Sequence, residues 1–210
     1  MRQPTTFLSS LGVAALLLLP AHSSATDAHY EDREDAVVRA FLTGQLAKAK
    51  GRPVCFKPTL LAVHPDSITR LRNGPPEPKT RGSRAYARDL SVWTQVPRRI
   101  LGEEREISIS SDAWKALHAR PATYGECRPL MQFTLHRVAI RRSTAMIHGN
   151  QGSACGSSSF GANVRAVDGR WSPVHWKGYY AVSGPPACGR LPISPELAAM
   201  PGYVMIGEPP

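Results

Sequence analysis

The amino-acid sequence predicts an α+β fold, in which an N-terminal helix and a short second helix pack on an antiparallel β-meander of about four strands. Three observations predict it. Apolar residues recur at helical spacing between residues 29 and 50, apolar and polar residues alternate between 131 and 182, and Asp168-Gly169 provides a two-residue hairpin turn. We also expect two disulfides, because four cysteines follow an export signal.

The first 25 residues have the composition of a cleavable secretory signal peptide. Arg2 makes the start positive, an apolar run from Phe7 to Leu19 follows, and Ser23-Ser24-Ala25 provides the small residues that a signal peptidase requires. This run is shorter than the roughly 20 residues that cross a bilayer. We therefore expect a secreted or periplasmic protein that begins at Thr26 and has no integral membrane segment after cleavage. An uncleaved membrane anchor is the alternative.

Removal of 25 of the 210 residues leaves 185, which is enough for one domain with a hydrophobic core. We place a single α+β domain at 26–184. Residues 185–210 contain seven prolines and are expected to form a proline-rich extended tail. Its apolar stretch 203–206 is expected to dock on the domain.

The four cysteines are Cys55, Cys127, Cys155 and Cys188. An even number in an exported chain indicates disulfides, and three pairings are possible. We favour Cys55 with Cys127 and Cys155 with Cys188, because each bridge then lies near the end of a predicted strand. The chain has no Cys-x-x-Cys and no paired Cys/His spacing of the kind that zinc sites use, so we expect no metal and no cofactor.

The first predicted element is a helix from about His29 to Lys50. Acidic residues at 31–35 lie near its start and Lys48 and Lys50 lie near its end, as the helix dipole favours. Gly51 and Pro53 are its stop signals. One apolar stripe runs along it and is expected to pack on the sheet: Ala36, Val37, Ala40, Phe41 and Ala47.

The next segments predict short elements around a long loop. Val54–Phe56 is a short strand, and residues 72–83, with three prolines and two glycines, predict an exposed basic loop. Glu106–Ser110 alternates as a half-buried strand. Ser111-Asp112 then begins the short second helix, which carries Trp114.

The strands of the meander follow. Met131–Leu135 is the first, and the apolar pattern continues at Val138 after a change of phase that indicates a bulge. Strands at 144–148, 160–166 and 171–182 complete it, and Pro173 indicates a sheet edge or a bulge in the last one. The hidden face of this sheet would hold Phe133, Leu135, Phe160, Val164, Val174, Trp176 and Tyr180.

A long helix followed by a meander that closes on Asp168-Gly169-Arg170-Trp171 is similar to the small cone-shaped domains called NTF2-like. The resemblance concerns architecture at a handful of positions. Such domains include both enzymes and non-enzymes, so the resemblance implies no particular function.

The chain carries 26 Lys and Arg against 16 Asp and Glu, a net charge of +10. The basic residues dominate two stretches, 52–101 and 128–190. A basic surface attracts polyanions such as nucleic acid, anionic lipid head groups or acidic glycans. Arg outnumbers Lys by 20 to 6, so genome composition is an alternative source of the excess charge, which would then serve solubility.

Alternation places polar side chains on the sheet face opposite the apolar one: Gln132, Thr134, His136, Asn163, Arg165, His175, Lys177 and Tyr179, with His148 as a further candidate. We expect Asn163, Arg165, Lys177 and Tyr179 to contact an anionic partner. These residues favour a non-catalytic binding module for an anionic surface or polymer. The alternative is a secreted hydrolase of the phosphodiesterase or nuclease type, with His136 and His175 as general base and general acid.

Overall fold

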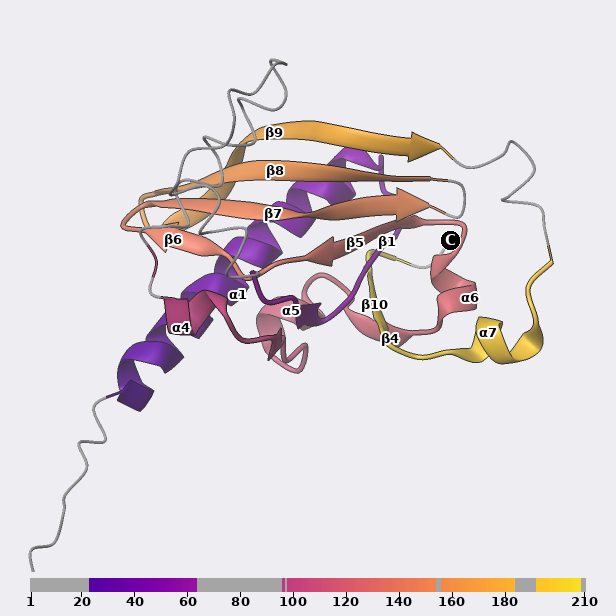
Figure 1. Cartoon of the computed structure of the whole chain (residues 1–210), viewed down its shortest axis with the longest axis horizontal. Helices are drawn as coiled ribbons and strands as arrows, with labels where there is room; N and C mark the ends of the chain where they lie inside the picture. Colours follow the sequence, from indigo (N-terminus) through magenta and orange to yellow (C-terminus); the bar gives the residue numbers. More distant parts are fainter. Residues whose placement is uncertain (1–22, 64–95, 97, 154–155, 184–191, 209–210) are drawn as a thin grey trace, which may run out of the picture.

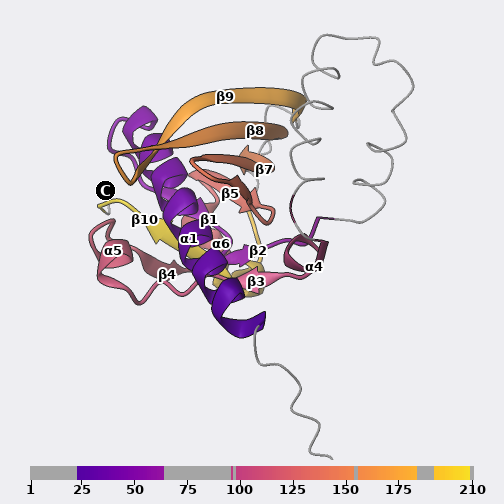
Figure 2. The same ribbon diagram turned by 90° about the vertical axis from the view of Figure 1, so that its left-hand side faces the viewer.

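A computed structural model describes residues 23–63, 96, 98–153, 156–183 and 192–208, with the backbone alone for 23–27, 98 and 174–183. In these residues a long helix, α1 (Ser23–Lys48), lies on one face of an eight-stranded mixed sheet (Figure 1). Figure 2 shows α1 running across the sheet while β8 and β9 curve over it. No helix in this part of the chain is long and apolar enough to cross a membrane.

The other described helices are short: α4 (Arg98–Leu101), α5 (Asp112–Lys115), α6 (Tyr124–Cys127) and α7 (Pro195–Ala199). The strands are β1 (Val54–Phe56), β2 (Thr59–Leu60), β3 (Arg105–Glu106), β4 (Arg120–Ala122), β5 (Met131–Leu135), β6 (Ala139–Arg141), β7 (Thr144–Ser153), β8 (Gly156–Val167), β9 (Arg170–Ser183) and β10 (Tyr203–Ile206).

The large sheet has the strand order β4-β10-β1-β5-β7-β8-β9, with β6 also paired to β7, and β2 and β3 form a separate pair. The expected α+β fold with a four-stranded antiparallel meander is therefore wrong, because the described residues form mostly β structure with one long helix. Strands β7, β8 and β9 do form a meander, but β1 pairs with β5 in parallel and β10 inserts between β1 and β4. The alternation of polar and apolar residues indicates where strands lie, and it carries no information on which distant strand each one joins.

The core lies between α1 and the sheet. Phe41 stacks on Phe160 at 5.2 Å between ring centroids and meets Phe133 edge-on at 5.6 Å. Four of the expected core residues, Phe133, Leu135, Phe160 and Val164, are buried, whereas the side chains of Val174, Trp176 and Tyr180 lie outside the described residues. The buried stripe of α1 includes Val37 and Phe41 as predicted. Ala47 is exposed instead, and Val38 and Leu42 complete the stripe.

Local turn signals are confirmed. Asp168 and Gly169 both have positive φ, +50° and +76°, as the type I′ turn between β8 and β9 requires. Pro173 lies in the edge strand β9 beside a register shift, so the sheet avoids the hydrogen bond that proline cannot donate. The expected bulge after Leu135 is wrong, since the chain leaves β5 there and begins β6 at Ala139.

The expected strand at 106–110 is limited to β3, and the short second helix is confirmed as α5, with Trp114 fully buried. The C-terminal segment contributes β10 to the large sheet, where Val204, Met205 and Ile206 are buried. Residues 203–206 therefore belong to the same sheet as the strands between 54 and 183.

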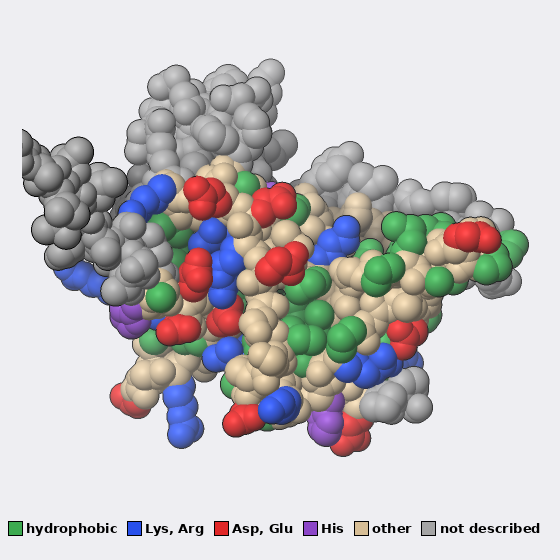
Figure 3. Space-filling model, turned by 90° about the horizontal axis from the view of Figure 1, so that it is seen from below, with side chains coloured by type: hydrophobic (Ala, Val, Ile, Leu, Met, Phe, Trp, Pro, Cys, Tyr) green, Lys and Arg blue, Asp and Glu red, His purple; other side chains and the backbone are tan. Residues whose placement is uncertain are grey.

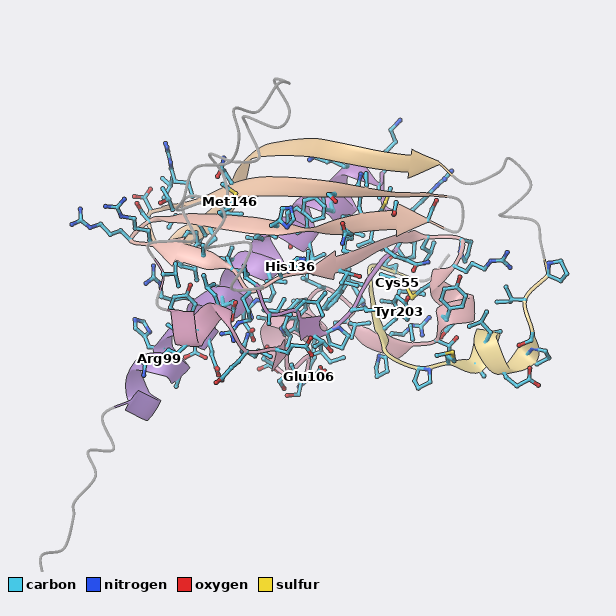
Figure 4. All side chains as sticks on the ribbon, in the orientation of Figure 1. Cys55, Arg99, Glu106, His136, Met146 and Tyr203 are labelled. Carbon is cyan, nitrogen blue, oxygen red and sulfur yellow. A yellow bond between two sulfur atoms is a disulfide. The ribbon has the colours of Figure 1, made fainter. Side chains whose placement is uncertain are left out.

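Cys55 and Cys127 form a disulfide, with their Cα atoms 5.7 Å apart, which confirms that expected pairing. Cys155 and Cys188 lie outside the described residues, where the second expected pairing falls. The disulfide packs with Ala122 and Met205, and Tyr203 lies against this cluster. Figure 4 shows Cys55 and Tyr203 at the end of the sheet where β1 and β10 meet.

Candidate functional site

Two histidines meet on the face of the sheet that points away from α1. His136 follows directly after β5, and its backbone N–H donates to the carbonyl of His148 in β7 at 2.9 Å. Leu135 and Ile147, which directly precede the two histidines, are buried in the core with residues of α1. Because successive side chains of a strand point to opposite faces, both imidazoles lie on the other face of the sheet. Their ring centroids are 5.4 Å apart with the planes inclined by 47°.

Burial favours the neutral form of both imidazoles. Burial lowers the pKa of His136 below its ordinary value, and the contact of its ring with the carbonyl of Ala62 opposes this only in part. Burial, together with the neighbouring His136, lowers the pKa of His148 to about 4. His136 Nδ1 lies 3.4 Å from Ala62 O. Because a carbonyl only accepts hydrogen bonds, Nδ1 carries the proton and Nε2 retains its lone pair.

The other expected site residues lie further along the same sheet. Asn163 in β8 is half-buried and pairs with Met146 on one side and with His175 on the other. Arg165 is exposed and pairs with Thr144. Lys177 pairs with Gly161, and Tyr179 lies where the register of β8 and β9 shifts; the side chains of His175, Lys177 and Tyr179 are outside the described residues.

The backbone register separates the two histidines of the hydrolase hypothesis. His136 follows β5, whereas His175 belongs to β9, three strands away in the sheet order. At about 4.8 Å for each strand, this is roughly 14 Å between backbones. The imidazole that the structure places beside His136 is that of His148, which the sequence named only as a further candidate.

A second site was missed by the sequence analysis. A groove of about 690 Å³, which we call the cationic groove, lies at the end of α1, where the C-terminal turn of the helix faces the start of β5. It is lined by Lys48, Ala49, Lys50, Arg52, Pro53, Pro129, Leu130, Met131 and Ser153. Among the described residues, this lining contains three exposed cations and no carboxylate. The signal was present in the sequence, but Lys48 and Lys50 were interpreted as partners of the helix dipole alone.

The shape of the cationic groove follows from how α1 ends. Lys50 and Gly51 have φ of +56° and +81°, and this left-handed pair turns the chain out of the helix toward β1. β1 begins at Val54, which pairs with Met131 at the start of β5. The disulfide of Cys55 and Cys127 lies two residues beyond Pro53 and two residues before Pro129. The disulfide therefore links the two chain segments that line the groove, the one that ends at Pro53 and the one that begins at Pro129.

Some basic residues outside the groove form ion pairs with acidic residues of the fold. Arg105 makes ion pairs with Glu31, Glu34 and Asp35 of α1. Figure 3 shows acidic and basic side chains interspersed on the face that it presents, with hydrophobic side chains toward the end that carries α7. Charges of both signs mixed in this way give a weaker field than a cluster of one sign. The cationic groove differs from this mixed surface, because every charged residue in its described lining is positive.

A small cavity of about 140 Å³ lies beside α1 and α4, and its lining includes Tyr30 and Arg137. Both side chains serve the fold. The hydroxyl of Tyr30 donates to the carbonyl of Val138 at 2.6 Å, and Arg137 Nη1 donates to the carbonyl of Glu103 at 3.0 Å. We therefore assign this cavity a structural role.

In the described part of the chain, no three His, Cys, Asp or Glu side chains gather in a group that could hold an ion. Searches of protein-family models, curated proteins and solved structures found no match to this chain, so no function comes to it from a relative.

Proposed function

We propose that the protein is exported and acts as a non-catalytic binding module, which takes an anionic group of a surface or polymer into the cationic groove. One observation carries the proposal: Lys48, Lys50 and Arg52 line one groove, and no carboxylate accompanies them among its described lining residues. The N-terminal apolar run and the Cys55–Cys127 disulfide support export, since disulfides persist in oxidising compartments.

The size and composition of the groove suit such a ligand. Its volume of about 690 Å³ lies within the range of small-ligand sites. Each contact between a cation and an anion in water contributes on the order of 1 kcal/mol, so several cations must act together. Pro129, Leu130 and the 43 % exposed Met131 add apolar contact area beside the charges.

The proposal predicts binding that weakens as salt rises, because bound counterions are released when the protein neutralises a polyanion. We would measure retention on immobilised heparin and co-sedimentation with phosphatidylglycerol vesicles, using phosphatidylcholine vesicles as the neutral comparison. Heparin alone would indicate a polymer ligand, and phosphatidylglycerol alone would indicate a lipid surface. No binding to either at low salt would overturn the proposal.

Charge-reversal variants locate the site. Lys50→Glu with Arg52→Glu alters the cationic groove, whereas Arg165→Glu with Lys177→Glu alters the sheet face that the sequence analysis favoured. Arg141→Glu with Arg170→Glu makes the same change in net charge at exposed positions outside both sites. We expect loss of binding in the groove variant alone. Equal losses in all three would show that only net charge matters and would contradict the groove assignment.

A further inference from the structure

We propose that His136 and His148 together bind a divalent transition-metal ion, with Cu²⁺ held most tightly. The inference does not depend on the cationic groove, because the two histidines lie on the outer face of the sheet and line no part of that groove. It rests on the spacing of the two rings, on the hydrogen bond that orients one of them, and on their ligand chemistry.

The spacing of the rings fits two ligands of one ion. A metal–nitrogen bond of about 2.0 Å places the ion about 3.2 Å from the centroid of each imidazole. Two rings that meet at a roughly tetrahedral angle then have centroids about 5.2 Å apart. The centroids of His136 and His148 are 5.4 Å apart. The strands already hold the rings at this spacing, because the backbone N–H of His136 donates to the carbonyl of His148.

The hydrogen bond of His136 has the form found behind metal ligands. A ligating histidine donates its other ring N–H to a carbonyl or carboxylate, which fixes the tautomer and the orientation of the ring. His136 Nδ1 lies 3.4 Å from the carbonyl of Ala62. The remaining nitrogen, Nε2, is therefore the one that presents a lone pair to an ion.

The surroundings favour an ion bound by nitrogen. Imidazole suits copper, zinc and nickel, and the affinity of a given site generally rises toward Cu²⁺. Met146, two residues from His148 in β7, is buried with Val63, Val96 and Leu101, so an apolar cluster adjoins the pair. His148 pairs with Gly161 of β8, and this glycine has no side chain that could cover the imidazole from that strand. We assign the protein two ligands, and water completes the coordination.

The test uses the purified, untagged full chain after treatment with a chelator. In all samples His29→Gln removes an exposed imidazole near the N-terminus that could bind copper on its own. Calorimetric titration with CuCl₂, NiCl₂ and ZnCl₂ then compares His136→Gln and His148→Gln with His118→Gln, whose side chain is 60 % exposed in the α5–β4 connection. We expect affinity for Cu²⁺ to fall by at least about tenfold in the first two variants and to be unchanged in the third.

Electron paramagnetic resonance of the Cu²⁺ complex provides a second measurement that needs no substitution at the site. We expect couplings to two imidazole nitrogens. Couplings to one or none, or an affinity that survives both His136→Gln and His148→Gln, would overturn the inference. Circular dichroism of each variant distinguishes loss of the site from loss of the fold.

Discussion

Arg137 donates through Nε to both carboxylate oxygens of Glu34, at 3.0 and 3.1 Å, and the two side chains are almost fully buried. Glu34 also accepts a hydrogen bond from the backbone N–H of Val138 at 2.7 Å. Burial raises the pKa of the Glu34 carboxyl, and the bonds from Arg137 and Val138 oppose that rise. This ion pair joins α1 to the segment between β5 and β6.

Glu34→Leu is expected to lower the free energy of unfolding by about 3–5 kcal/mol, because it leaves the Arg137 guanidinium buried without its carboxylate. Urea denaturation followed by circular dichroism measures the change. The exposed pair of Lys115 and Asp112 provides the control, since Asp112→Asn should cost less than about 1 kcal/mol. Glu34→Leu combined with Arg137→Leu should recover much of the loss. A Glu34→Leu variant as stable as wild type would contradict the role of the pair.

Tyr30 is expected to make the protein sensitive to alkali. Its hydroxyl donates to Val138 O and accepts from the N–H of Ile140, and burial raises the pKa of the phenol to about 12. The unfolded chain releases this proton near pH 10, so stability is retained below pH 10 and is lost as the pH rises toward 12, by about 2–3 kcal/mol. Denaturation midpoints between pH 9 and about 12 should therefore fall more in wild type than in Tyr30→Phe. Parallel pH profiles would contradict the prediction.

The Cys55–Cys127 disulfide is expected to contribute about 4 kcal/mol to stability, because it closes a long loop in the unfolded chain. Its cysteines are 72 residues apart. Cys55→Ala with Cys127→Ala should lower the midpoint of thermal unfolding. The double variant should also bind the ligand more weakly at temperatures where it stays folded, since the disulfide lies beside Pro53 and Pro129, which line the cationic groove. Binding that is unchanged under those conditions would show that the groove does not need the cross-link.

Gly149→Ala is expected to destabilise the sheet. A Cβ at this position would lie 2.3 Å from the carbonyl oxygen of Thr134 and 3.2 Å from Leu135 Cα, so β5 and β7 would have to separate. Overpacking of this kind costs about 1–3 kcal/mol. Gly152→Ala, in the same strand, is the matched control because its nearest neighbour, the carbonyl oxygen of Gly156, is 3.1 Å away. Equal stability of the two variants in urea would contradict the close approach of β5 to β7.

The sequence predicted much of the local structure. The basic end of the first helix, the Asp168-Gly169 turn and the burial of Phe133 and Phe160 all follow from residues within a few positions of each other. The expected acidic start is wrong, because the helix begins at Ser23 rather than near His29 and its first turn contains no acidic residue. Alternation also placed His136 and Arg165 on the face opposite the apolar residues, where the structure has them. Such patterns report which face of an element is buried and where the chain must turn.

Tertiary structure alone decided how the strands pair and which side chains meet. The parallel pairing of Val54 with Met131 and the insertion of β10 beside β1 join segments more than 70 residues apart. Both depend on the total free energy of packing strands of three to five residues into one sheet, which no local pattern encodes. The parallel pairing brings Lys50 and Leu130 into the lining of one groove, and the antiparallel pairing of β5 with β7 brings His148 to the side of His136. The sequence thus determined the elements and their buried faces, and the pairing of the strands determined both candidate sites.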